Sequence, residues 1–466
     1  MKSSARRRLT LTSSVVGAVI VALDGTVLTV AQPTLQRELN ASFSQVQWTS
    51  TGYLIAVASL LVFAGRLGDR YGHQRLFAMG ILGFGATSAG IGLAPGIGWV
   101  IGLRVAQGIF GALLQPATLG MLRAAYPPDR LGMPIALRTS AIGLAAAAGP
   151  VVGGALVTHL GWRAVFFLHV VPALVMGALV LTVRAPARGR VPAGGLDLSG
   201  ACLLAVALVC LVRALVGIPE TGWTTATALE LVVVAATGAV FVRHERRTAN
   251  PLLPPDVLGS AAIGAALGIL VAASAAMLGA LFVGSYFLQE VLRLDPLRTS
   301  LHALPGAVMM VVGAPVSAVL MRRLGARRTS LAGLGNLTLG VVLLSRLDEE
   351  STAVAIGTGF LLLGAGFATV MVTATAVVVR HASASSAGVA GGLQQTAMNV
   401  GPTLGISVAT TVMALTGGVA TGPPLTVLAA VSATGLPLAL RLPGRIGTVT
   451  ADRRPPQDAV EVRARR

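Results

Sequence analysis

Long apolar runs recur along the whole chain, separated by short segments rich in charged residues, proline or glycine. A membrane-spanning helix needs about 20 mainly apolar residues, and the runs have about that length. They do not show the alternation over about ten residues that is typical of membrane β-strands. The pattern predicts fourteen transmembrane helices, at residues 11–35, 46–65, 76–94, 98–122, 134–158, 164–183, 197–217, 225–242, 260–289, 301–321, 329–345, 353–378, 387–414 and 425–440.

The composition supports this interpretation. Of the 466 residues, 54% are hydrophobic and only 11% are charged, and the mean hydropathy is +0.79. A soluble domain usually carries about 25% charged residues. These values exclude a soluble globular protein and a disordered chain, and they indicate an all-α polytopic membrane protein.

Basic residues are distributed unequally between alternate connections. If the N-terminus is cytoplasmic, the cytoplasmic segments hold 28 of the 35 Lys and Arg residues and the outside connections hold five. Arg and Lys favour the cytoplasmic side of membrane proteins. We therefore expect a bacterial plasma-membrane protein with both termini in the cytoplasm. The net charge of +18 then reflects topology and anionic lipids, not nucleic acid. This count places Arg138 in a cytoplasmic connection.

Two polar connections that contain proline, at 184–195 and 243–256, divide the predicted helices into groups of six, two and six. The segments GRLGDRYGHQR at 65–75 and LMRRLGARR at 320–328 occupy equivalent places in the two larger groups, which favours an internal repeat. We expect an N-terminal six-helix bundle over 1–190, an inserted helix pair over 191–248, a C-terminal six-helix bundle over 249–445 and a disordered cytoplasmic tail over 446–466.

Asp24 is the acidic residue placed deepest in any predicted span. A charged side chain at the bilayer centre costs about 2.5–3.5 kcal/mol on insertion scales, so it usually has a function there. Arg104 lies at nearly the same predicted depth and could pair with Asp24, which predicts a proton-coupling site. The alternatives are an Asp that bonds nearby backbone and an Arg that bonds carbonyl groups or extends to the surface.

Two glycine-rich segments are candidates for conformational control. The connection at 65–75 combines glycines, which permit close helix contact, with charges that can bond neighbouring helix ends. Its candidate gating residues are Gly65, Gly68, Asp69, Arg70, Gly72 and Arg75. The run at 143–156 combines small residues with a proline that bends the helix. Its candidate residues are Gly149, Pro150, Gly153 and Gly154.

Polar residues inside other spans are candidates for a substrate cavity. Gln395 and Asn399 are four residues apart and share a helix face. The remaining candidates are Thr26, Gln32, Gln107, Gln115, Tyr286 and Gln289. Hydrogen bonding between helices is an equally good interpretation of this set. The six histidines are scattered and form no metal-binding pattern, and no phosphate-binding loop is present. We expect neither an enzyme nor any cofactor, with protons as the coupling ion.

Taken together, these segments resemble the major facilitator superfamily, and within it the fourteen-span drug:proton antiporters. The resemblance extends over nearly the whole chain. LDGTVLTVAQP at 23–33 resembles the first-helix signature, and GRLGDRYGHQR resembles the loop motif, with His73 and Gln74 in place of the usual basic pair. The fourth-helix and antiporter motifs are matched by LRVAQGIFGAL at 103–113 and GPVVGG at 149–154.

This resemblance implies a major facilitator fold of two six-helix bundles with two extra helices, which transports by alternating access. It also implies a monomeric, proton-coupled exporter of hydrophobic, often cationic, drug-like molecules, with Asp24 and Arg104 in proton coupling. A dedicated exporter of one natural product is an alternative. A proton-coupled importer and a non-transporting membrane sensor are further alternatives, each less favoured by the motifs.

Overall fold

A computed structural model describes residues 3–182, 196–248, 250–294, 296–383, 385–416 and 421–444. Every regular element within these ranges is helical. The connection at 184–195 and the tail at 446–466 lie outside the described residues, as does the predicted boundary between the N-terminal bundle and the inserted pair.

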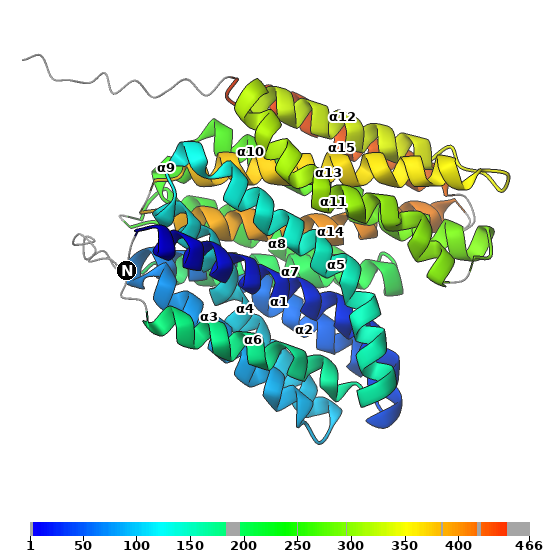
Figure 1. Ribbon diagram of the computed structural model, residues 1–466, viewed down its shortest axis with the longest axis horizontal. Coiled ribbons are helices and arrows are strands. Elements are labelled where there is room, and N and C mark those ends of the chain that lie inside the picture. Colours follow the sequence, from blue (N-terminus) through cyan, green and yellow to red (C-terminus); the bar gives the residue numbers. More distant parts are fainter. Residues whose placement is uncertain are drawn as a thin grey trace, which may run out of the picture.

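The first six long helices pack into an N-terminal bundle (Figure 1). Within it, α4 packs against α1, α2 and α3, because glycines such as Gly80 and Gly108 bring the helices to backbone contact. The helices are α1 (Ser3–Glu38), α2 (Phe43–Tyr71), α3 (His73–Gly92), α4 (Ile97–Ala125), α5 (Gly132–Leu160) and α6 (Arg163–Thr182), with a short turn of helix, η1, at Pro128–Arg130.

A C-terminal bundle of matching size follows the inserted pair, and one large apolar core fills it. The final predicted span is divided between α15 and α16, which are separated at Thr434. The helices are α9 (Pro255–Leu258), α10 (Ala261–Tyr286) with its π-helical continuation η2 (Phe287–Val291), α11 (Pro296–Leu324), α12 (Ala326–Leu344), α13 (Ala353–His381), α14 (Ala387–Leu415), α15 (Gly422–Ala433) and α16 (Gly435–Ala439).

Among the described residues, eleven helices are long and apolar enough to cross a membrane, or twelve if the bent α5 is counted as one span. Each of the fourteen predicted runs coincides with a helix or helix pair, but α3 and α12 fall outside this set. Both are short, at 20 and 19 residues, and both begin with polar residues that shorten the apolar stretch. The fold is that of a multi-pass membrane protein, and the count of fourteen spans stays a prediction.

The two bundles meet along a seam made of two equivalent helix pairs. On one side α2 packs against α14, and on the other α11 packs against α5. Exchanging α2 with α11 and α14 with α5 converts one pair into the other, as expected for a repeated unit. The repeat extends to the turns, because Gly72 after α2 and Gly325 after α11 both adopt positive φ, at 112° and 84°. Only glycine adopts this conformation without strain.

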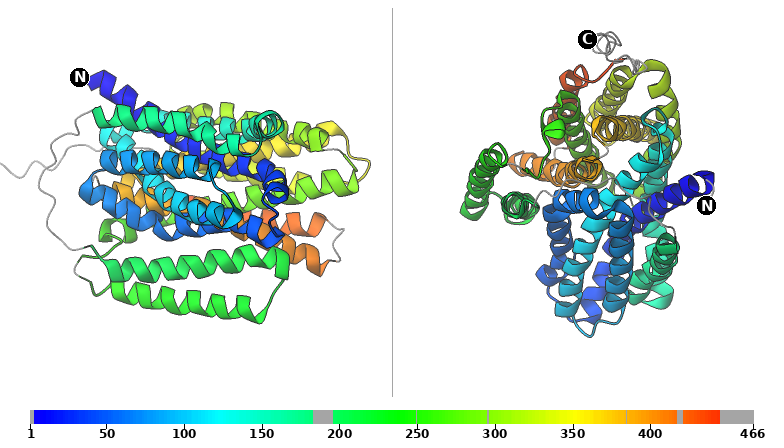
Figure 2. Two further views of the ribbon diagram at one scale, coloured as in Figure 1. Left: turned by 90° about the horizontal axis from the view of Figure 1, so that it is seen from below. Right: turned by 90° about the vertical axis from the view of Figure 1, so that its left-hand side faces the viewer.

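The inserted helices α7 (Leu198–Thr221) and α8 (Thr225–Glu245) pack on each other beside the seam (Figure 2). Helix α7 contacts both α2 of the first bundle and α14 of the second. The turns that carry Gly72 and Gly325 lie at one end of the molecule, together with Arg66, Arg322 and Arg323. We call this the basic end.

Candidate functional site

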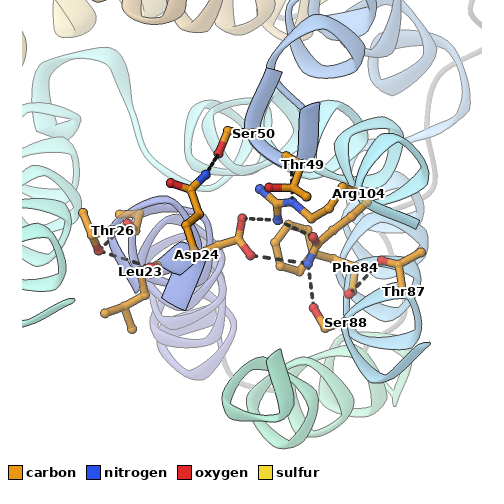
Figure 3. A network of polar contacts seen from close by, with 12 residues as sticks. Leu23, Asp24, Thr26, Thr49, Ser50, Phe84, Thr87, Ser88 and Arg104 are labelled. Carbon is orange, nitrogen blue, oxygen red and sulfur yellow. Dashed lines mark hydrogen bonds and ion pairs between the residues drawn. The ribbon is translucent and has the colours of Figure 1, made fainter. Parts of the chain in front are cut away.

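One ion pair joins α1 to α4 within the N-terminal bundle (Figure 3). Arg104 Nη1 donates to Asp24 Oδ2 at 2.7 Å, and each residue is only 1% exposed. Asp24 lies in the middle of a 36-residue helix, and Arg104 lies in the first third of α4. The structure therefore brings together the two charges that the sequence placed at similar depth.

Further hydrogen bonds fix both members of this pair. Gln107, one turn after Arg104, accepts from the same Nη1 and donates through Nε2 to Ser88 Oγ at 2.6 Å. Its Nε2 also lies 3.5 Å from Asp24 Oδ1. Arg104 Nε donates to the carbonyl oxygen of Thr49 at 2.9 Å, and the guanidinium carbon lies 4.4 Å from the centre of the Tyr53 ring. Four helices thus contribute to one polar network.

The network joins two buried charges of opposite sign. A buried pair is stable only while both charges are present, because an unpaired buried charge costs about 3–5 kcal/mol. If the two groups separate, Gln107 and the Thr49 carbonyl can still hold the guanidinium.

A second polar contact lies at the basic end, and this one crosses the seam between the bundles. Asp69, in the last turn of α2, accepts hydrogen bonds from the backbone amides of Gly388 at 2.7 Å and Val389 at 3.0 Å. These amides belong to the first turn of α14, where a helix leaves its N–H groups unpaired and carries partial positive charge. We call this contact the Asp69 cap, and it joins the two bundles.

Backbones touch beside the Asp69 cap. A Cβ added to Gly65 would overlap the carbonyl of Gly388, and one added to Gly388 would overlap the carbonyl of Gly65. His73 Nε2 lies 3.2 Å from Asp69 Oδ1, and its ring occupies the space that a Cβ on Gly68 would need. His73 was not among the candidate gating residues, yet it contacts the carboxylate that joins the bundles.

The remaining gating candidates lie around this contact. Gly72 forms the turn between α2 and α3, as its positive φ requires. The guanidinium carbon of Arg70 lies 5.5 Å from the centre of the Tyr71 ring, and Arg75 is exposed.

Comparison with known proteins identifies the family. The model of the Major Facilitator Superfamily matches residues 15–406, which is most of the chain. This protein belongs to the major facilitator superfamily. The chain is 41% identical to the tetracenomycin C resistance and export protein of Streptomyces glaucescens, over 87% of this chain and 76% of that protein. It is 33% identical to the puromycin resistance protein pur8 of Streptomyces alboniger, over 84% and 79% of the two chains.

A solved structure shares the fold. The proton:xylose symporter XylE aligns with a TM-score of 0.68 over 95% of this chain and 97% of its own, at 13% sequence identity. At this identity the similarity concerns the fold alone. It agrees with the two-bundle arrangement of the major facilitator superfamily and with the seam described above.

The glycine segment at 149–154 on α5 lies against α1. A Cβ on Gly149 would overlap the Thr26 hydroxyl, and one on Gly153 would lie 3.0 Å from Val27, whereas Gly154 faces open space. The axis of α5 bends by 42° between Gly149 and Val151, which places the bend at Pro150. This segment therefore sets the contact between α1 and α5.

The cavity candidates do not gather in one place. Gln107 belongs to the ion-pair network, and Gln115 is buried in α4. The remaining candidates bond within or between helices or lie near helix ends. Thr26 donates to carbonyls of its own helix, Gln32 donates to Ser50 on α2, Asn399 donates to the carbonyl of Gln395, and Tyr286 and Gln289 are exposed at the end of α10 and in η2.

Two carboxylates that the sequence did not single out hold the segment between α8 and α10. Glu245 accepts from the amides of Leu252 at 3.1 Å and Leu253 at 2.8 Å. Asp256 accepts from the hydroxyl of Ser386, at the start of α14, at 2.7 Å. Burial alone would raise the pKa of Asp256, but hydrogen bonds from Ser386 and Ser383 outweigh it and hold that pKa below its ordinary value. Asp256 follows two prolines in the first turn of α9. Proline at the start of a helix is a pattern that could have been recognised in the sequence.

The placement of Arg138 in a cytoplasmic connection is wrong. Arg138 lies inside α5, seven residues into the helix, and only 3% of it is exposed. The charge count grouped Arg138 with the nearby polar stretch at 127–130, although the predicted span at 134–158 already included it, and α5 begins at Gly132.

Proposed function

We propose that this protein exports hydrophobic, drug-like or antibiotic molecules across the bacterial plasma membrane in exchange for protons. The observation that carries the proposal is the buried ion pair of Asp24 and Arg104, since it can bind a proton only when its members separate. The relatives named above, which are antibiotic resistance and export proteins, support the direction of transport.

In the proposed cycle the basic end faces the cytoplasm, both termini are cytoplasmic, fourteen helices span the membrane and the monomer is the working unit. Opening at the basic end breaks the Asp69 cap and admits substrate between the bundles. Closing it re-forms the cap and directs the substrate outward. A proton from outside then binds Asp24, releases Arg104 to its other partners and favours substrate release. Return to the inward-facing state transfers that proton to the cytoplasm.

The test is dye or antibiotic efflux from cells that express the wild type or the Asp24→Asn variant at matched membrane levels. We expect efflux to stop both with a proton uncoupler and with the variant. The matched control is Asp129→Asn, because Asp129 is a carboxylate with 70% of its side chain exposed. Efflux that persists in Asp24→Asn would remove Asp24 from the mechanism.

A dedicated exporter of one natural product is the second candidate. The observation that favours it is the sequence identity of 41% to the tetracenomycin C export protein. The identity to the puromycin resistance protein is lower, at 33%. Efflux of a single compound class across a panel of antibiotics would support it, and efflux of several unrelated classes would contradict it.

A further inference from the structure

A cluster of apolar side chains closes the seam at the basic end. It includes residues from α4, α5, α11 and α13, so both bundles contribute to it. We call it the inner plug, and its buried members are Leu119, Leu122, Leu131, Ile135, Met321, Ala376 and Val379.

Three arginines flank the inner plug on its own helices. Arg123 and Arg380 lie four residues after plug members of α4 and α13, and Arg138 lies three residues after Ile135 of α5. Residues at these spacings share a helix face. In each arginine Nε is buried and has no hydrogen-bond partner among the described residues. Arginines of three helices therefore lie beside the inner plug, and among them Arg380 donates through Nη2 to the carbonyl oxygen of Asp129 at 3.3 Å.

Arg138 is the most deeply placed of the three. It lies three residues further along α5 than Ile135, away from the start of the helix at the basic end. It is nearly as buried as Arg104, at 3% against 1% exposed. Arg104 has a carboxylate partner, whereas no ion pair holds Arg138 within the part of the chain that the structure describes.

The charges of the seam helices do not balance. Away from their ends, the described residues of α1, α2, α4, α5, α10, α11, α13 and α14 include one carboxylate, Asp24, and Arg104 already neutralises it. Arg138 therefore leaves this interior with a net positive charge. An unpaired buried charge is costly, so its presence calls for an explanation such as a functional role or a bound ion. A hydrophobic cation would be repelled here, and an anion would be attracted.

We infer that Arg138 binds the acidic group of a hydrophobic organic anion, a carboxylate or phenolate, and that Arg123 and Arg380 attract such molecules to the open basic end. This inference rests on the proposed function and replaces the expectation of cationic substrates. A guanidinium presents a planar fork of donors that suits a carboxylate. The phosphate of an anionic lipid has the same chemistry and is the competing source of the anion.

The experiment uses two dyes that share a xanthene ring, the anion fluorescein and the cation rhodamine 6G. Binding of each is measured by fluorescence anisotropy on purified protein in phosphatidylcholine nanodiscs, and transport is measured in proteoliposomes. Arg138→Gln removes the charge, and Arg138→Lys keeps the charge without the fork. The matched control is Arg213→Gln, because Arg213 is an exposed arginine that is paired with Glu230 on the inserted helices.

We expect the wild type to bind fluorescein, and Arg138→Gln to weaken that binding roughly tenfold to a hundredfold, as for loss of a charge-assisted hydrogen bond. Arg138→Lys should recover part of the affinity, and Arg213→Gln should match the wild type. Rhodamine 6G binding should not weaken in Arg138→Gln, which also shows that the variant is folded. Equal fluorescein affinity in wild type and Arg138→Gln would overturn the inference.

Two further outcomes separate the competing explanations. If phosphatidylglycerol in the nanodisc changes stability through Arg138 while fluorescein affinity does not depend on Arg138, the site binds lipid and the substrate assignment is overturned. If fluorescein binds through Arg138 but no dye moves in proteoliposomes under a proton gradient, the anion site stands and the export proposal fails. Transport of rhodamine 6G alone, independent of Arg138, would leave export standing and remove the anion site.

Discussion

The two bundles share a fold but differ in what they bury. The N-terminal bundle buries Asp24 and Arg104 in a network with Gln107 and Ser88. In the C-terminal bundle, the buried polar residues within the described helices are uncharged, and hydroxyls such as those of Ser274 and Thr373 donate to carbonyls of their own helices. A repeated fold can therefore keep its packing while the buried charges are confined to one of its two copies.

The difference between the bundles is tested most directly by removing one charge of the Asp24–Arg104 pair. Asp24→Leu leaves Arg104 buried and unpaired, so we expect the free energy of unfolding to fall by about 3–5 kcal/mol. The double variant Asp24→Leu/Arg104→Leu should recover much of that loss without recovering transport, because neither buried charge is then left without its partner. Thermal unfolding of the purified variants measures both values. A double variant no more stable than the single one would contradict this account of the pair.

Introducing a side chain between the bundles tests the seam. Gly65→Val should prevent closure at the basic end, because its Cβ alone would overlap the carbonyl of Gly388. We expect loss of most transport with folded protein in the membrane, and increased labelling of a cysteine placed at Leu119 in the inner plug. Gly154→Ala is the control, since Gly154 faces open space. Normal closure in Gly65→Val would show that the helices can separate at little cost.

Removing the charge of the Asp69 cap should have a smaller effect. Asp69→Asn replaces one charge-assisted hydrogen bond, worth about 1.5–3 kcal/mol, with a weaker neutral one and removes the other, because the amide NH2 cannot accept from a backbone N–H. We expect the fraction of molecules open at the basic end to rise roughly tenfold, measured as a distance between spin labels on α2 and α14. The same labels with Arg75→Gln, a charge change at an exposed residue of the same turn, provide the control. An unchanged distance distribution would contradict the role of Asp69.

The smallest expected effect concerns Asp256 in the C-terminal half. Its pKa in the folded protein lies below the ordinary value of 3.8, because hydrogen bonds from Ser386 and Ser383 outweigh burial. The stability that it contributes is therefore present above pH 3.8 and is lost as pH falls through the lower, folded value. Asp256→Asn should reduce the acid sensitivity of unfolding only slightly, because Asp256 is exposed to solvent. A steeper acid dependence in the variant would show the opposite sign.

Much of the helical arrangement could be predicted from apolar length alone. Each predicted run coincides with a helix, because the bilayer requires long apolar segments whose backbone groups bond internally. The nearness of Asp24 and Arg104 could also be predicted, since both depths follow from the rise along a helix.

Contacts that depend on how the bundles meet could not be predicted. The amides bonded by Asp69 lie more than 300 residues away along the chain, and no local pattern indicates them. The burial of Arg138 was missed because a charge near a helix start looks the same whether its side chain turns inward or outward. Gln107 was placed with the cavity candidates because its i+3 relation to Arg104 has meaning only once Asp24 and Ser88 are known to face it.

The two sides of the Asp69 cap differ in how a substitution affects the hydrogen bonds. On α2 the contact depends on one carboxylate, so nearly every codon change at Asp69 weakens it. On α14 the donors are main-chain amides, which every residue except proline supplies. In a mutational scan, replacements at Val389 should keep the hydrogen bond, although its buried side chain limits their size, whereas nearly every replacement at Asp69 should weaken the contact. At Gly388 an added Cβ would overlap the carbonyl of Gly65, so the contact restricts replacement in both bundles, by side-chain chemistry in one and by space in the other.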